Sequence, residues 1–212
     1  CMGTLRGQWN PDATAIRWQQ GGSLAIDPLK SFGGLAEPQA CELPDGRIFV
    51  LLRAGNVLAS QDHPGVPSVK LWSVSSDRGD HWSSPEPLTY EDGRYVYSPR
   101  SYQDLVLSTK NGRLYAVMNI LDAPSHMCDP RSTLQIAEID TETLCVRRGT
   151  VTVIETRLEE HHELVRFSNF AMAEDRTSRN LLLFMKLHMA ESCFVRYGYD
   201  HSLYRYEISL PD

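Results

Sequence analysis

The stretch Ser75-Ser76-Asp77-Arg78-Gly79-Asp80-His81-Trp82 decides the fold, and it fits the pattern Ser-x-Asp-x-Gly-x-x-Trp between two strand-like runs. Asp77 can accept hydrogen bonds from backbone N–H groups across a tight turn, and Gly79 can adopt the positive φ that such a turn requires. Trp82 can fold back as an apolar plug over the hairpin that the turn closes. The pattern therefore predicts a turn between two antiparallel strands and not a catalytic site.

The runs around this turn belong to a repeated unit of four extended segments. Glu37, Tyr102 and Phe167 open three successive units, each 65 residues after the one before. The order of strand, tight turn, strand and long loop recurs in the units, and no helical stretch interrupts it. Four short strands per repeat at this period are typical of the blades of a β-propeller.

We expect an all-β chain with blade units at about 37–100, 101–165 and 166–210. Residues 1–36 are expected to form the end of a preceding blade, with short strands near 13–18 and 23–27. The third unit lacks a fourth strand, and about three blades cannot close a ring, because each open face would leave apolar surface in water. The chain is therefore expected to be a partial propeller that associates with a second copy or with an upstream half.

The composition and charge of the chain argue against several classes of protein. The chain has 212 residues, of which 42% are hydrophobic, so it can bury a core. Its net charge of −6 argues against a nucleic-acid partner, which needs a basic face. No apolar run approaches the roughly 20 residues of a membrane span, and the N-terminal residues do not resemble a signal peptide. The five cysteines form no C-x-x-C pair, which predicts buried free thiols, no metal site and no cofactor, and leaves a secreted or periplasmic location open.

The turn motif resembles the Asp-box, or BNR repeat, of the sialidase (neuraminidase) β-propellers, and two further segments support that resemblance. Residues 37–53 are similar to the sialidase segment in which a glutamate opens an inner strand and an arginine ends its hairpin partner. Residues 129–136 are similar to the segment that carries the last of three substrate-binding arginines. The resemblance implies a propeller with six blades when complete, of which this chain holds about three and part of another.

The resemblance also implies roles for individual residues. Glu37 would be the catalytic glutamate, which in sialidases polarises a tyrosine nucleophile, and Arg53 and Arg131 would grip the carboxylate of the substrate. Arginine suits that role because its planar guanidinium donates two parallel, charge-assisted hydrogen bonds to a carboxylate. The inner strands of successive blades begin at one mouth of the central channel, where these side chains are expected to meet.

Three further residues lie close in sequence to strand ends at this mouth, and we expect them to bind substrate: Arg100, Tyr102 and His126. Packing in the core or in a turn is an equally good interpretation for Arg100 and Tyr102.

The chain departs from the family at the position of the nucleophile. Sialidases carry a tyrosine at the start of a later inner strand, and here Phe167-Ser168-Asn169-Phe170 stands in its place. Phenylalanine cannot attack an anomeric carbon, so the ordinary sialidase mechanism cannot operate. The first arginine and the catalytic aspartic acid of the family would lie upstream of residue 1. We therefore expect a glycoside hydrolase of the sialidase-like superfamily that acts on an acidic or other glycan, with Phe167 arguing against sialic acid.

Two other functions remain open from the sequence. A polysaccharide lyase on uronates would use an arginine to neutralise the carboxylate and a tyrosine or histidine to remove the α-proton, and the candidates are Tyr97, Tyr102, His126 and His162. A non-catalytic glycan-binding propeller would instead stack its aromatic side chains on sugars. Likeness of fold does not decide among these functions.

Overall fold

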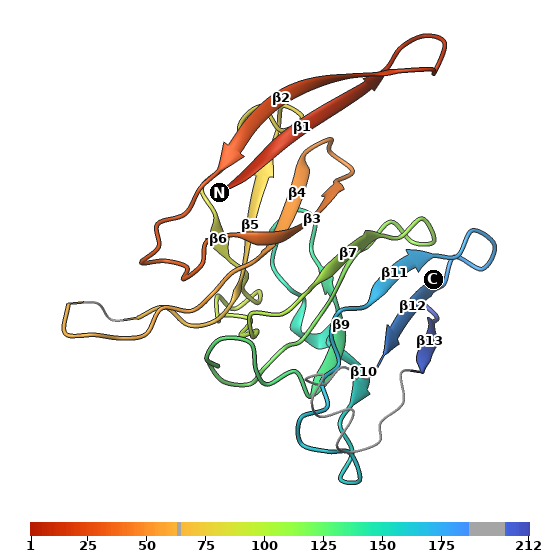
Figure 1. Cartoon of the computed structure of the whole chain (residues 1–212). Coiled ribbons are helices and arrows are strands. Elements are labelled where there is room, and N and C mark those ends of the chain that lie inside the picture. The colour runs from red at the N-terminus through yellow and green to blue at the C-terminus, as the bar shows by residue number, and fades with distance from the viewer. Residues whose placement is uncertain (63–64, 187–201) are drawn as a thin grey trace.

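The computed structural model describes residues 1–62, 65–186 and 202–212, and its regular elements there are strands apart from one turn of 3-10 helix. The strands are β1 (Met2–Trp9), β2 (Ile16–Leu24), β3 (Ala36–Glu42), β4 (Ile48–Arg53), β5 (Lys70–Ser75), β6 (Glu86–Pro87), β7 (Asp104–Leu107), β8 (Leu114–Met118), β9 (Thr133–Ile139), β10 (Thr152–Thr156), β11 (Ala171–Glu174), β12 (Leu181–Lys186) and β13 (Leu203–Ile208), and the helical turn is η1 (Arg148–Thr150). The all-β prediction is confirmed (Figure 1). None of the helical structure in the described ranges is long and apolar enough to cross a membrane.

The strands form four antiparallel sheets that follow one another along the chain. Their strand orders are β1-β2, β3-β4-β5-β6, β7-β8-β9-β10 and β11-β12-β13. The first strand of each of the last three sheets lies innermost, since β3 contacts β7 and β7 contacts β11 (Figure 1). The ends of these inner strands are therefore brought together although they are far apart in sequence. The division into blade units stays a prediction.

The central strands β4 and β8 are covered on both faces. In β4, Phe49 and Leu51 enter a core shared with β8, whereas Val50 and Leu52 enter a second core shared with Leu24 at the end of β2. Alternate residues of β8 divide in the same way between the first core and a third core shared with β12. Because successive side chains of a strand point to opposite faces, the sheets are stacked face to face and apolar packing fixes their order.

The turn after β5 has the hydrogen bonds that the motif predicts, and Ser75 adds to them. Asp77 Oδ1 accepts the backbone N–H of His81 at 2.8 Å, and Gly79 has a φ of 86°. The buried hydroxyl of Ser75 accepts the N–H of Gly79 at 2.7 Å and donates to Asp77 Oδ1 at 2.8 Å. One serine hydroxyl therefore ties both ends of the turn together.

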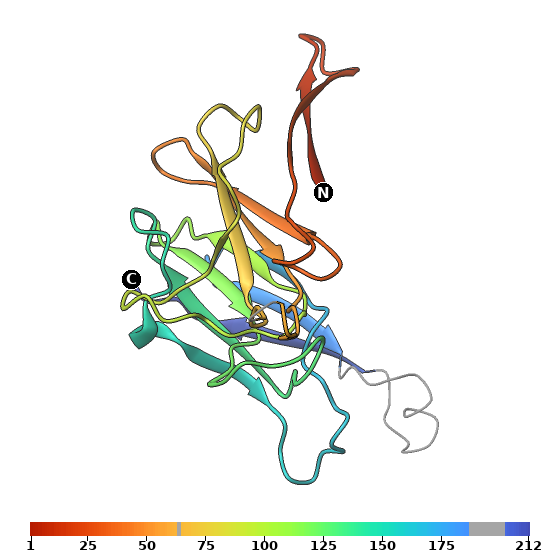
Figure 2. The same ribbon diagram turned by 90° about the vertical axis from the view of Figure 1, so that its left-hand side faces the viewer.

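This turn also holds the β1–β2 hairpin against the rest of the molecule. Gly22 donates its N–H to the carbonyl of Gly79 at 2.7 Å, and the indole of Trp82 donates to Thr4 Oγ1 at 3.0 Å. Trp82 thus reaches across to the preceding hairpin, in addition to packing on the core beside β4. Figure 2 shows the hairpin standing away from the other sheets, joined to them at its base.

The strand positions expected in the first segment were wrong, because one long hairpin replaces the strands near 13–18 and 23–27. The side chain of Asn10 accepts the backbone N–H groups of Thr14 and Ala15 at 2.9 and 3.1 Å, which places the reversal at these residues. Gly21 and Gly22 lie inside β2, where a Cβ would come within 2.6 and 2.3 Å of backbone oxygens in the turn after β5. The glycine pair thus permits a close backbone approach and does not break the strand.

The cysteines differ in part from their prediction. Cys1, Cys41, Cys128 and Cys145 carry free thiols, but none of the four is fully buried and Cys1 is exposed. Burial nevertheless raises the pKa of the Cys41 thiol to about 11. Cys193 lies outside the described residues. No group of three potential metal ligands occurs in the part of the chain that the structure describes.

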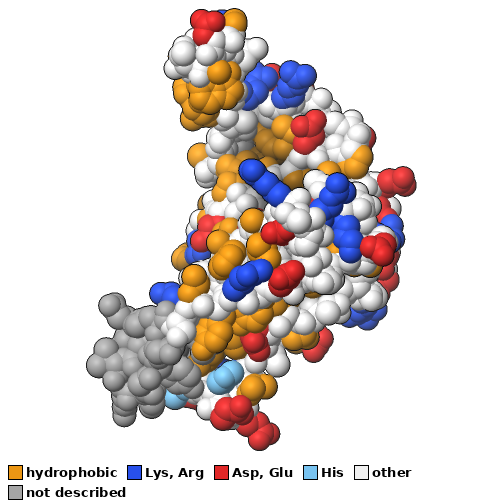
Figure 3. Space-filling model, turned by 90° about the vertical axis from the view of Figure 1, so that its right-hand side faces the viewer, with side chains coloured by type: hydrophobic (Ala, Val, Ile, Leu, Met, Phe, Trp, Pro, Cys, Tyr) orange, Lys and Arg blue, Asp and Glu red, His pale blue; other side chains and the backbone are white. Residues whose placement is uncertain are grey.

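One face of the projecting hairpin is apolar and open. The register aligns Gly7 with Trp18 and Trp9 with Ile16, so these side chains share a face with Leu5. Leu5, Trp9 and Trp18 are 69%, 61% and 61% exposed. Figure 3 shows hydrophobic side chains gathered on this hairpin. Contiguous exposed apolar surface of this kind is typical of an interface.

We expect the chain to self-associate through this face. Burial of the tryptophans on a second copy removes apolar surface from water, so Trp18→Ser should shift the sedimentation coefficient toward that of a monomer. Sedimentation velocity over a concentration series measures this shift. Tyr95→Ser, which removes an aromatic ring that is 41% exposed elsewhere, is the control. A wild-type chain that stays monomeric at every concentration contradicts the expectation.

Ser75→Ala is expected to destabilise the chain by about 1 to 3 kcal/mol, because it leaves buried polar groups of the turn without a partner. Urea unfolding followed by tryptophan fluorescence measures the change. The neighbouring Ser76 is exposed, so Ser76→Ala is the matched control and should change stability by less than about 0.5 kcal/mol. Equal effects of the two substitutions would show that the Ser75 hydroxyl does not organise the turn.

Candidate functional site

Glu37 and Arg53 form an ion pair where β3 begins and β4 ends. Arg53 Nη1 donates to Glu37 Oε1 at 2.6 Å. The register between β3 and β4 shifts between Ala36 and Gln39, and Glu37 in this irregularity has a φ of 46°. A left-handed conformation is costly for a glutamate, and such residues cluster at functional sites. The irregular backbone therefore aims this carboxylate at the guanidinium.

The carboxylate of Glu37 keeps one oxygen unused. Its Oε2 is buried and has no hydrogen-bond partner among the described residues. Gln103, whose side chain is fully buried, donates from Nε2 to the main-chain carbonyl of Glu37 at 2.6 Å. Gln103 thus fixes the backbone of Glu37 and leaves the free carboxylate oxygen to other groups.

Lys70 is a third ionisable residue next to this pair, and no role was predicted for it. Lys70 is opposite Arg53 in the register of β4 and β5, and its side chain is fully buried. Its Nζ donates to the carbonyl of Ser101 and to that of Pro99, the latter at 3.3 Å. Burial, with the positive charges of Arg53 and Arg131 nearby, holds the pKa of Lys70 well below its ordinary value. A lysine that loses its proton more easily reduces the repulsion between two cations directly opposite each other on paired strands.

Arg131 joins three loops at the same end of the sheets. The guanidinium donates to the carbonyl of Cys128 at 2.7 Å, to that of Arg100 at 3.1 Å and to Ser168 Oγ at 3.4 Å. Only 8% of Arg131 is exposed. Since Glu37 and Arg131 both act electrostatically on Lys70, the structure gathers the predicted Glu37, Arg53 and Arg131 around one buried amine.

Tyr102 connects the inner strands β3 and β7. Its hydroxyl accepts a hydrogen bond from Gln39 Nε2 at 3.0 Å and donates to Asp104 Oδ2 at 3.4 Å, and its ring packs edge-on against Phe170. Burial, followed by the charge and hydrogen bond of Asp104, raises the pKa of Tyr102 to about 12. Burial also raises the pKa of Asp104. Near neutral pH the tyrosine hydroxyl therefore keeps its proton and cannot act as a base, while the carboxyl of Asp104 has a raised affinity for a proton.

Phe167 belongs to the apolar core and not to the surface of the site. Its side chain is 1% exposed and lies in the core shared by β8, β9 and β12. Its backbone N–H donates to the carbonyl of Arg131 at 2.8 Å, and this hydrogen bond fixes the backbone at Arg131. No hydroxyl is present where the sialidase resemblance places the nucleophile.

Arg100 and His126 lie to one side of this cluster. The N–H of Arg100 donates to the carbonyl of Met127 at 2.7 Å, and its guanidinium lies against Gly33. His126 is exposed, and its Nδ1 is 3.3 Å from Asn56 Nδ2. His126 therefore lines a neighbouring groove and makes no recorded contact with Glu37 or Arg53 in the described chain.

The other residues considered for a lyase occupy structural positions. Tyr97 packs on the core next to β4, with Tyr95 edge-on to its ring. His162 Nδ1 accepts the backbone N–H of Leu164 at 3.1 Å in the loop after β10.

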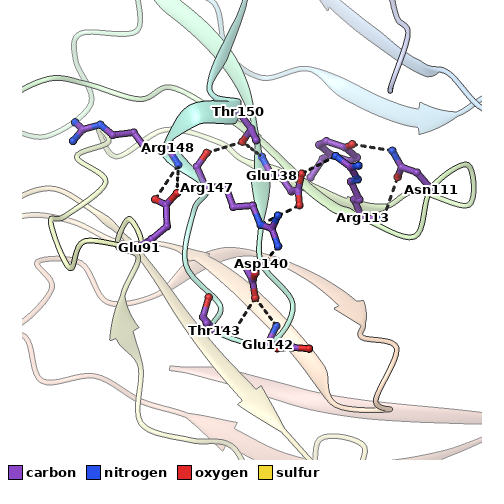
Figure 4. A network of polar contacts seen from close by, with 11 residues as sticks. Glu91, Asn111, Arg113, Glu138, Asp140, Glu142, Thr143, Arg147, Arg148 and Thr150 are labelled. Carbon is purple, nitrogen blue, oxygen red and sulfur yellow. Dashed lines mark hydrogen bonds and ion pairs between the residues drawn. The ribbon is translucent and has the colours of Figure 1, made fainter. Parts of the chain in front are cut away.

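A second polar network lies at the C-terminal end of β9 (Figure 4). Glu138, which is nearly buried, pairs with Arg113 at 3.3 Å and with Arg147 at 3.2 Å. Arg147 also pairs with Asp140 at 2.7 Å, and the backbone N–H of Thr143 together with Arg147 lowers the pKa of Asp140 to about 2. These four charged groups are mutually paired, so they fasten the edge of the sheet and offer no free charge to a ligand.

Sequence reasoning missed three polar residues of the site: Lys70, Gln103 and Asp104. Lys70 had a detectable signal, since a charge inside a strand that reads Val69-Lys70-Leu71-Trp72 is either paired or functional. Gln103 and Asp104 directly follow Tyr102. The packing of β7 against β3 gives Gln103 its partner, whereas Asp104 is hydrogen-bonded by its neighbours Tyr102 and Leu105.

Comparisons with known proteins concern the fold of the chain. No protein-family profile matches the chain, and a search of curated proteins found no significant match. Among solved structures, a mutant of NanB sialidase from Streptococcus pneumoniae is similar with 15% identity and a TM-score of 0.50, over 82% of this chain and 22% of that one. Trypanosoma rangeli sialidase is similar with 12% identity and a TM-score of 0.50, over 87% and 25%.

The chain folds as part of a sialidase-like β-propeller. It spans about a quarter of the length of these two sialidases. Identities this low concern the arrangement of strands and assign no chemistry to individual residues.

Lys70→Met is expected to change how stability depends on pH. In the unfolded chain lysine titrates near its ordinary value of about 10.4, whereas burial lowers the pKa of Lys70 in the folded chain. Between the two values the unfolded state binds more protons, so the free energy of unfolding of the wild type should rise with pH relative to the variant, by up to about 1.4 kcal/mol per pH unit.

Urea titrations at several values between pH 7 and 10 measure this difference. Lys30→Met, at an exposed lysine, is the control and should run parallel to the wild type. Parallel curves for Lys70→Met as well would mean that the buried amine keeps its proton in the folded state.

Proposed function

We propose that the protein is a glycoside hydrolase acting on glycans that carry an acidic group. The observation that carries the proposal is the Glu37–Arg53 pair, in which one carboxylate oxygen is held at 2.6 Å and the other is buried without a partner among the described residues. A carboxylate oriented by a cation and left with a free oxygen is suited to accept a proton from a reacting group.

In this proposal Glu37 acts as the general base. It takes a proton from a water molecule whose oxygen attacks the anomeric carbon, and the glycosidic bond breaks as the leaving oxygen receives a proton. Asp104 is the candidate donor of that proton, because burial raises its pKa by more than the hydrogen bonds from Leu105 and Tyr102 lower it. Direct attack by water fits the replacement of the family's tyrosine by Phe167. General acid–base catalysis of this kind contributes about a hundred- to ten-thousandfold in rate.

The acidic group of the glycan would bind at Arg53 and Arg131. The positive charges of both guanidinium groups lower the pKa of Lys70, so both groups lie at the same end of the stacked sheets as Glu37. The two solved structures described above are named as sialidases, which supports an acidic sugar as the class of substrate.

A uronate lyase is less well supported, because the pKa of Tyr102 is raised to about 12, so its hydroxyl keeps its proton near neutral pH and is not available as the base. A glycan-binding propeller without catalysis remains the second candidate, because Phe167 is a core residue at the position where the resemblance expects the nucleophile.

The test is incubation of the protein with sialosides, uronate polysaccharides and neutral glycans, with the products weighed by mass spectrometry. Products that have gained one water support the hydrolase. Products that have not gained water and carry an unsaturated end identify a lyase. Retention of a glycan without any product identifies a binding protein, and neither retention nor product contradicts the carbohydrate assignment.

We expect two substitutions to separate catalysis from binding. Glu37→Gln keeps the shape but removes the base, so kcat should fall by about a hundredfold or more with KM little changed. Arg53→Lys removes the bidentate guanidinium, so KM for the acidic glycan should rise by about tenfold or more. Glu42→Gln, at an exposed glutamate of β3, is the matched control. An unchanged kcat in Glu37→Gln would remove this residue from the mechanism.

A further inference from the structure

An apolar groove lies beside the polar cluster and is not used in the proposed mechanism. Its volume is about 770 Å³, and its walls come from the loop after β2, the loop after β4 and the loop before β9. Leu29, Phe32, Leu58 and Met127 line it and are 56%, 57%, 65% and 44% exposed. Four large apolar side chains that share one concave surface in water are typical of a ligand site.

Buried hydrogen bonds hold the walls of the groove in place. The buried Asn56 accepts the backbone N–H of Met127 on its Oδ1 at 2.8 Å, which ties the loop after β4 to the loop before β9. The buried Ser31 accepts the N–H of Gly55 on its Oγ at 2.9 Å, which ties the loop after β2 to the loop after β4. The groove is therefore formed before any ligand arrives, and binding costs little ordering of the protein.

A positive charge borders the groove. The backbone N–H of Arg100 donates to the carbonyl of Met127, one of the lining residues. The guanidinium of Arg100 lies against Gly33, the neighbour of Phe32, so closely that a Cβ there would be 2.6 Å from Nη2. No carboxylate is recorded as a partner of Arg100 in the described residues, its Nε is buried without a hydrogen bond, and no acidic residue lines the groove.

We propose that this groove is a subsite for an aryl or alkyl group attached to the acidic ligand, with Arg100, whose carbonyl accepts a hydrogen bond from Arg131, as a further cation for the acidic group at the border of the groove. The complementary features are an apolar wall and an unpaired cation at its border, so the occupant is an amphipathic anion. Only the identification of the ligand as a glycan rests on the proposed function. The substrate would then be an acidic glycan with an apolar substituent or aglycone. The preference for a ring next to a negative charge does not depend on a sugar.

Isothermal titration calorimetry with three probes tests the subsite. The probes are 4-phenylbutyrate, which has a ring and a carboxylate, butyrate, which lacks the ring, and 4-phenylbutanol, which lacks the charge. We expect 4-phenylbutyrate to bind at least about tenfold more tightly than either partial probe, because only it fills the groove and pairs with Arg100. Equal affinities of the wild-type protein for 4-phenylbutyrate and butyrate, or for 4-phenylbutyrate and 4-phenylbutanol, would overturn the proposal without any variant.

Two variants locate the binding. Leu58→Ser should reduce the affinity for 4-phenylbutyrate by about tenfold and leave that for butyrate unchanged, and Arg100→Gln should abolish the preference for 4-phenylbutyrate over 4-phenylbutanol. Leu158→Ser, at a leucine that is 48% exposed in the loop after β10, is the matched control. Equal losses in Leu58→Ser and Leu158→Ser would place the ring elsewhere and overturn the subsite.

The outcomes separate this subsite from the proposed function. If the glycan panel gives no product while 4-phenylbutyrate binds as described, the hydrolase proposal fails and the subsite stands. If glycans are hydrolysed but phenyl and methyl glucuronides bind equally well, the subsite fails and the hydrolase stands.

Discussion

Burial of single strands on both faces is the constraint on which the rest of this structure depends. Phe49 and Val50 are neighbours in β4, yet they enter different cores, and the same division occurs in β8. A sheet with two apolar faces is stable only between two others, so each sheet fixes the position of the next. The candidate site follows from this stacking, because it brings the ends of β3, β4 and β7 together and encloses Lys70 between them.

Enclosure between the sheets shifts the pKa values of ionisable groups in the polar cluster. A lysine opposite an arginine on the surface of a sheet would remain charged and repel it, whereas the buried Lys70 gives up its proton more readily and donates to main-chain carbonyls. The same low-dielectric surroundings raise the pKa of Asp104. Packing of apolar side chains thus shifts the pKa values of groups near the Glu37–Arg53 pair, which links the core directly to the chemistry proposed for the site.

Short sequence patterns were sufficient to predict several strands and one turn of this fold. The strands 48–53 and 133–139 and the turn after β5 were predictable because an apolar run or a turn motif determines them within a few residues. The β1–β2 hairpin was not, since its glycine pair resembles a break until the turn that it contacts is known. In the site, Glu37 and Arg53 were predictable from neighbours in sequence, whereas Gln103 has meaning only through a carbonyl 66 residues away.

The close approach of the hairpin to the turn after β5 also limits how this sequence can evolve. At Gly21 and Gly22 any side chain would meet a backbone oxygen, and at Gly79 it would meet Thr4. At Gly21 and Gly22 the obstacle is backbone, which no change of a neighbouring side chain removes, and Gly79 also needs its positive φ. Substitutions should therefore accumulate freely along the tip of the hairpin but be excluded at its base, where a sequence profile of relatives would show paired invariant glycines far apart in the chain.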